Sequence, residues 1–165
     1  MTTARTPLAR RSFRGVAVAA IAGAGIALSP LPASAHTAVA ASASATAVSS
    51  AAQTAVNTAL AQVGDRYVYG ATGPNSFDCS GLTTFSYKAA GVSLPRTSKA
   101  QSGFGAPVSK ANLQPGDLVF FYSPVSHVAM YIGNGQIVHA LNASKPVQVM
   151  KLDSMPSYAG ARRVA

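Results

Sequence analysis

The first half of the folded region has apolar side chains at the spacing of an α-helix. From residue 52 to residue 63, small and apolar side chains recur every three or four positions, and a glycine follows. A second stripe of this kind begins at Cys79, with Asp78 placed to cap its start and Gly91 to end it. We therefore expect two helices before the middle of the chain.

After residue 116 the pattern changes to that of β-strands. Short segments rich in β-branched and aromatic residues are separated by turn signals, and Asn134-Gly135 is a strong hairpin signal. The expected strands are residues 117–122, 127–133, 136–141, 147–152 and 161–165. Helices first and strands afterwards indicate an α+β fold, in which N-terminal helices pack on a mostly antiparallel sheet of five to six strands.

The first 51 residues have a different character from the rest. Residues 1–35 read as a signal peptide: a basic leader precedes an apolar run that is shorter than the roughly 20 residues of a membrane span, and Ala33-Ser34-Ala35 is a small-residue cleavage site. The letters RRSF also fit a twin-arginine signal, so both export routes stay open. Residues 36–51 are rich in Ala and Ser and predict a flexible linker, which leaves one domain over residues 52–165.

Charge narrows the choice of partners. Without the signal peptide the chain has nine lysines and arginines against four aspartates, a net charge of +5. This balance suits an anionic polymer or surface, and the anionic cell envelope fits an exported protein. No block of basic residues or basic-aromatic stripe is present, so we expect no nucleic-acid partner. A mild positive charge that only aids solubility explains the composition equally well.

Cys79 is the only cysteine of the chain. Cysteines of exported proteins usually pair, so a single one is a buried small residue, an intermolecular link or a nucleophile. The first turn of a helix favours the thiolate, because unpaired N–H groups and the positive end of the helix dipole lie there. His127 and His139 are the only histidines after residue 51, and a cysteine followed by distant histidines is a layout of Cys–His nucleophiles. Composition alone leaves the three interpretations open.

Four ordered motifs carry a resemblance to a known family. They read YVYGATGPNSFDCSGL, LPRTSKAQ, PGDLVFF and SHVAMYIGNGQIVHA. Together they resemble the NlpC-type cell-wall peptidases, a papain-like family of bacterial peptidoglycan endopeptidases. The resemblance spans residues 53–164 and implies a papain-like fold for this domain. Tyr69 stands where the family commonly has Trp, which puts details of substrate binding in doubt.

The resemblance also implies roles for individual residues. It makes Cys79 the nucleophile, His127 the general base and His139 the third polar residue, which orients the base. Further residues with implied roles at the oxyanion and substrate site are Tyr67, Asp78 and Ser80. We expect no cofactor and no metal, because two histidines and one cysteine are a poor zinc-binding set.

The turn at Asn134-Gly135 decides whether His139 can serve His127. A two-residue turn would pair His127 with Asn142 and would point His139 to the opposite face of the sheet. A longer loop or a bulge would bring His139 onto the face of His127, as the resemblance requires. Asn142 is therefore the reserve candidate for the third catalytic residue.

The resemblance predicts a secreted, wall-associated, monomeric cysteine peptidase that acts on peptidoglycan. The expected reaction is hydrolysis of stem peptides, at the bond between D-γ-glutamate and the diamino acid. Two alternatives remain: a non-catalytic wall-binding module of the same fold, and a secreted antibacterial effector with the same chemistry.

Overall fold

The structure is a computed structural model and describes residues 48–165. The expected signal peptide and most of the expected linker lie outside the described residues. The first helix begins at Ser50, so the last two residues of the expected linker (36–51) are helical. The reason is an N-cap: the side chain of Ser49 accepts a hydrogen bond from the backbone N–H of Ala52.

Helices come first in the described part, and most strands follow. The elements are α1 (Ser50–Leu60), β1 (Arg66–Tyr67), β2 (Ser76–Phe77), α2 (Cys79–Ala89), α3 (Ser98–Gln101), β3 (Ala106–Val108), η1 (Lys110–Asn112), β4 (Leu118–Phe121), β5 (His127–Gly133), β6 (Gln136–His139), β7 (Gln148–Lys151), η2 (Leu152–Ser154) and β8 (Tyr158–Arg163). No helix among these residues is long and apolar enough to cross a membrane.

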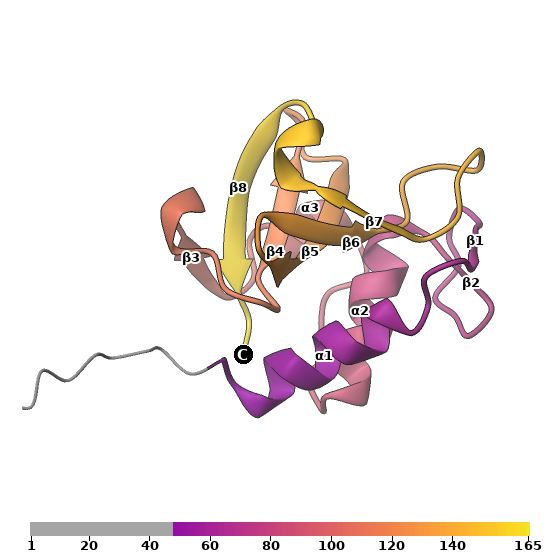
Figure 1. Cartoon of the computed structure of the whole chain (residues 1–165), viewed down its shortest axis with the longest axis horizontal. Helices are drawn as coiled ribbons and strands as arrows, with labels where there is room; N and C mark the ends of the chain where they lie inside the picture. Colours follow the sequence, from indigo (N-terminus) through magenta and orange to yellow (C-terminus); the bar gives the residue numbers. More distant parts are fainter. Residues whose placement is uncertain (1–47) are drawn as a thin grey trace, which may run out of the picture. The chain divides into compact units, whose positions relative to one another are not determined.

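The main sheet has six strands in the order β3-β8-β4-β5-β6-β7, and each pair of neighbours is antiparallel. In Figure 1, α1 and α2 lie together below this sheet. The expected α+β architecture is therefore confirmed. The sequence pattern missed β3, which is three residues long and contains Pro107, and the short parallel pair of β1 and β2.

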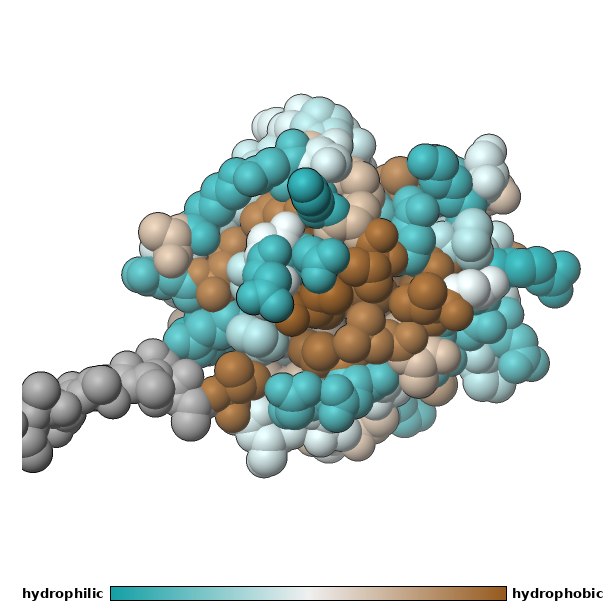
Figure 2. All heavy atoms as spheres, in the orientation of Figure 1, coloured by the Kyte–Doolittle hydropathy of each residue, from teal (hydrophilic) through white to brown (hydrophobic). Residues whose placement is uncertain are grey.

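The central strand β4 is buried on both faces, which explains its unbroken apolar sequence. Leu118 and Phe120 belong to the core between the sheet and the helices, whereas Val119 and Phe121 belong to a second core on the other face. Figure 2 shows hydrophobic residues gathered on the surface above α1, where the helix and the sheet meet.

Gly81 lets the loop before α2 approach the helix closely. A Cβ atom at this position would overlap the carbonyl oxygen of Ala71. We expect Gly81→Ala to lower the free energy of unfolding by roughly 2–3 kcal/mol, because backbone cannot move aside as a flexible side chain can. Chemical denaturation measures the change, and Gly103→Ala is the control, since its Cβ atom would make only an ordinary contact. Equal losses from both changes would contradict the steric explanation.

Candidate active site

Cys79 is the first residue of α2, and its side chain faces β5. Asp78 caps this helix, because its carboxylate accepts a hydrogen bond from the Gly81 N–H at 2.6 Å. The backbone N–H of Val128 is near enough to the Cys79 sulfur to favour its thiolate form. The thiol therefore meets the sheet at the residue directly after His127.

His127 and His139 lie against each other inside the protein. His127 is the first residue of β5, His139 is the last of β6, and both are buried. His127 Nε2 lies 3.0 Å from His139 Nδ1, within hydrogen-bond distance. The structure thus brings together the two histidines that the resemblance singles out.

A bulge in β5 makes this meeting possible. Gly133 pairs with Gln136, as a two-residue turn at Asn134-Gly135 requires. One step further along, Tyr131 already pairs with Ile137, so Ile132 is an extra residue on β5. The shifted register brings His139 onto the face of His127. Both readings of this turn were therefore correct in part, since the short turn and the bulge coexist.

Asn142 has a different environment. It is exposed, and its Oδ1 accepts a hydrogen bond from the Ser144 N–H at 3.0 Å. Its carbonyl oxygen also accepts a hydrogen bond from the Lys145 N–H, which closes a turn. Within the described part of the chain, His139 and not Asn142 is the hydrogen-bond partner of His127.

A cleft of about 410 Å³ opens in front of Cys79. Its walls include Tyr67, Asp78 and Ser80, the three residues expected at the oxyanion and substrate site. The cleft therefore gathers all three beside the thiol, and the exposed ring of Tyr69 stands at its rim.

Arg96 is a further residue of this cleft, and its partner was not foreseen. The structure pairs Arg96 with Asp78 through two hydrogen bonds of 3.1 and 2.6 Å. Arg96 also donates to the Ser80 hydroxyl at 2.9 Å. An arginine two residues before a short helix gives no indication of which of four aspartates it will meet.

A sequence model of the NlpC/P60 family matches residues 64–163, a stretch that contains the cleft and both histidines. The chain belongs to the NlpC/P60 family.

Relatives in this family are similar to the chain over its folded part. It is 48% identical over 114 residues to a probable endopeptidase of Corynebacterium glutamicum, covering 69% of the chain and 54% of that protein. It is 41% identical over 121 residues to a gamma-D-glutamyl-L-lysine dipeptidyl-peptidase of Bacillus cereus, covering 68% of the chain and 36% of the relative. The chain thus spans about half the length of the first relative and less of the second.

Solved structures of NlpC/P60 proteins have the same fold. A family member from Bacillus cereus aligns with a TM-score of 0.65 at 41% identity, over 68% of this chain and 39% of that one. The peptidoglycan hydrolase RipB from Mycobacterium tuberculosis aligns with a TM-score of 0.63 at 28% identity, over 69% of this chain and 64% of that one. The NlpC/P60 fold is therefore present in this chain.

Burial controls the ionisation of the candidate NlpC/P60 catalytic residues. It raises the pKa of the Cys79 thiol, and the N–H groups of Val128 and Ser80 oppose this only in part. Burial, with a contribution from the neighbouring His139, lowers the pKa of His127 to about 3. Burial therefore opposes the preference of the helix start for a thiolate at Cys79, and it favours the neutral form of both imidazoles.

The two buried histidines predict that the protein loses stability in mild acid. Burial lowers the pKa of His139 to about 4 and that of His127 to about 3, both below the ordinary 6.5. Between pH 6.5 and 4 the unfolded chain therefore binds more protons than the folded one, and stability falls as the pH falls. We expect the free energy of unfolding to drop by roughly 5 kcal/mol from pH 7 to pH 4.5, about half of it from each histidine.

Chemical denaturation at a series of pH values measures this loss. The His139→Gln variant is the control, because it removes one of the two titrating groups and should reduce the slope between pH 6.5 and 4. A slope that is unchanged in this variant would assign the acid sensitivity to other groups.

Proposed function

We propose that this chain is an exported cysteine endopeptidase that hydrolyses stem peptides of peptidoglycan. The observation that carries the proposal is the contact of His127 with His139 at 3.0 Å, beside the strand residue whose N–H lies near the Cys79 sulfur. A nucleophile, a base and a group that orients the base are the three parts that thiol hydrolysis needs.

The reaction begins with proton transfer from Cys79 to His127. Because burial favours the neutral form of both groups, the transfer accompanies attack of the sulfur on the peptide carbonyl carbon. For this step His127 donates its Nε2 hydrogen to His139 Nδ1 and accepts the thiol proton at its other ring nitrogen. The C–N bond then breaks, His127 protonates the departing amine, and water hydrolyses the thioester.

Tyr67 and the start of α2 stabilise the oxyanion. The backbone N–H of Cys79 is free of an intrahelical acceptor, as in any first turn, and can donate to the developing negative charge. Burial, followed by the nearby Cys79 and Asp78, raises the pKa of Tyr67. The phenol therefore keeps its proton at neutral pH and serves as a second donor.

The bond we propose is the one between D-γ-glutamate and the diamino acid. Support comes from the relative in Bacillus cereus, which is a gamma-D-glutamyl-L-lysine dipeptidyl-peptidase. The signal-like residues 1–35 and the net charge of +5 on the remainder support action outside the cell, at the anionic wall.

Digestion of purified muropeptides, followed by mass spectrometry, tests this proposal. We expect one product that ends in the D-glutamyl residue and a second that begins with the diamino acid. A broken glycan chain with an intact stem peptide would contradict it. Binding of muropeptides with no product would favour a non-catalytic wall-binding module.

The role of His139 has its own test. We expect His139→Ala to lower kcat roughly 100-fold, because His127 loses the acceptor that fixes its ring and tautomer. Asn142→Ala is the matched variant and should keep kcat within about 3-fold, since the amide only closes an exposed turn. A larger loss from the Asn142 change would reverse the two roles.

A further inference from the structure

A second hollow lies beside the cleft in front of Cys79 and shares Tyr67 with it. It has a volume of about 250 Å³ and is lined by Arg66, Tyr67 and the segment 143–146. Tyr67 also lines the cleft in front of Cys79. The two spaces therefore adjoin at Tyr67, so that a bound peptide long enough to pass this residue would reach the hollow.

The loop that forms the far wall is held in place by backbone hydrogen bonds. Asn142 closes its first turn through the N–H groups of Ser144 and Lys145. At the end of the loop, the Val147 N–H donates to the carbonyl oxygen of Asp65 at 2.8 Å, next to Arg66. Figure 1 shows this loop, between β6 and β7, at the same end of the molecule as β1. The hollow is thus built by segments that are tied together.

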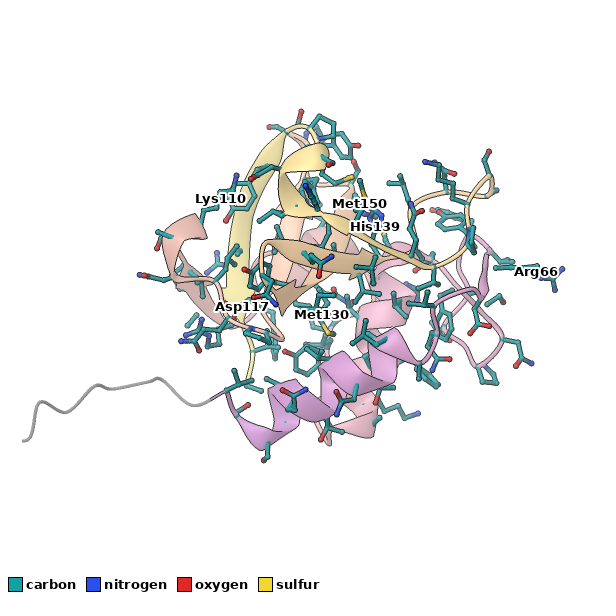
Figure 3. The ribbon with its side chains drawn as sticks, in the orientation of Figure 1. Arg66, Lys110, Asp117, Met130, His139 and Met150 are labelled. Carbon is teal, nitrogen blue, oxygen red and sulfur yellow. The ribbon has the colours of Figure 1, made fainter. Side chains whose placement is uncertain are left out.

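Two cations without an acidic partner line this hollow. Arg66 and Lys145 form no ion pair within the described part of the chain, in contrast to Arg96, which Asp78 neutralises in the neighbouring cleft. Figure 3 shows Arg66 projecting from the end of the protein near this loop.

The positive charge of Lys145 also acts on His139, one of the two candidate catalytic histidines. After burial, the charge of Lys145 is the second cause that lowers the pKa of His139. The lysine that lines the hollow thus also influences the buried histidine pair, and the hollow shares Tyr67 with the cleft.

We propose that Lys145, with Arg66 as a second cation, binds the free carboxylate of the diamino acid, which lies outside the scissile bond of the stem peptide. The proposal rests on the proposed peptidase function and adds a specificity determinant to it. A carboxylate is the complementary group for two unpaired cations, and amidation of that carboxylate removes the charge they would recognise. The small volume and the shared wall at Tyr67 favour a group of the bound peptide itself over a separate anionic polymer.

Binding to the Cys79→Ala protein tests the proposal without depending on hydrolysis. Titration calorimetry compares one muropeptide with its free carboxylates and the same muropeptide with its diamino-acid carboxylate amidated. We expect the free acid to bind roughly 3- to 10-fold more tightly at low ionic strength, and the difference to shrink as salt is added. Adding Lys145→Gln should abolish most of this preference.

Lys151→Gln is the matched control, because it removes the same charge from the exposed end of β7, away from the hollow. It should leave the preference for the free acid unchanged. An equal effect of the two lysine changes, or equal binding of both muropeptides to the Cys79→Ala protein, would overturn the carboxylate site.

Hydrolysis by the protein with Cys79 intact supplies a second readout. Lys145→Gln should raise KM for the free acid with little change in kcat, and should leave KM for the amidated peptide as it was. A fall in kcat for both peptides would show a structural effect and would also overturn the proposal. If neither peptide is cut, the proposed peptidase function fails, while the binding comparison still decides whether the carboxylate site exists.

Discussion

Replacing Cys79 by alanine is expected to abolish hydrolysis of muropeptides, with a loss of about 10,000-fold or more in kcat. The sulfur is the only atom in the described cleft that can form a thioester, and no neighbouring side chain can replace it. Tyr67, Ser80 and Ser126 have hydroxyl groups there, but none has the acidity of a thiol. Mass spectrometry of digests over a range of enzyme concentrations measures the residual rate.

The control for Cys79→Ala is a measurement of its stability, which shows whether the variant still folds. The cysteine makes no disulfide, and alanine keeps its backbone hydrogen bonds, so the free energy of unfolding should change by about 1 kcal/mol or less. The variant should also still bind the intact muropeptide. A digest that matches that of the unmodified protein would remove Cys79 from the mechanism.

Replacing His127 by glutamine is expected to lower kcat by roughly 1,000-fold. Glutamine is similar in length, and its amide can still donate a hydrogen bond to His139, but it cannot accept the thiol proton at neutral pH. Because burial raises the pKa of the Cys79 thiol, the variant would contain almost no thiolate at pH 7. Raising the pH should therefore restore part of the activity in the variant, and kcat measured from pH 6 to pH 10 checks this.

His139→Gln is the companion experiment for the base. If it lowers kcat more than His127→Gln does, and if high pH then rescues it, His139 would be the base and His127 the orienting residue. Similar losses without rescue in either variant would point to a shared structural role of the pair.

The start of α2 could be read from the sequence because its signals are local. Asp78 is a good N-cap, Cys79 follows it, and Gly91 has the positive φ of +77° that a residue after a helix often adopts. The strands were equally visible, since β4 and β5 are apolar and bounded by turns. Local side-chain chemistry thus placed the start of α2 at Cys79, where the structure has it.

The partners of the charged residues could not be read in this way. Arg96 meets Asp78 and Arg163 meets Asp117, across 18 and 46 positions of the chain. Strand β8 runs beside β4 and brings Arg163 next to Asp117. Such pairs depend on strand order, which no local pattern records.

The bulge at Ile132 has a consequence for judging relatives of this chain. His127 and His139 are 12 positions apart, and this spacing works only because one residue of β5 stands outside the ladder. A homologue with the same spacing but a regular hairpin would keep all three side chains and still be inert, with one histidine turned to the far side of the sheet. A homologue with one residue fewer and no bulge would retain the contact. When homologues are aligned, the presence of both histidines is therefore not enough to predict activity. The number of residues between them must also agree with the presence or absence of the bulge, so that both side chains lie on one face of the sheet.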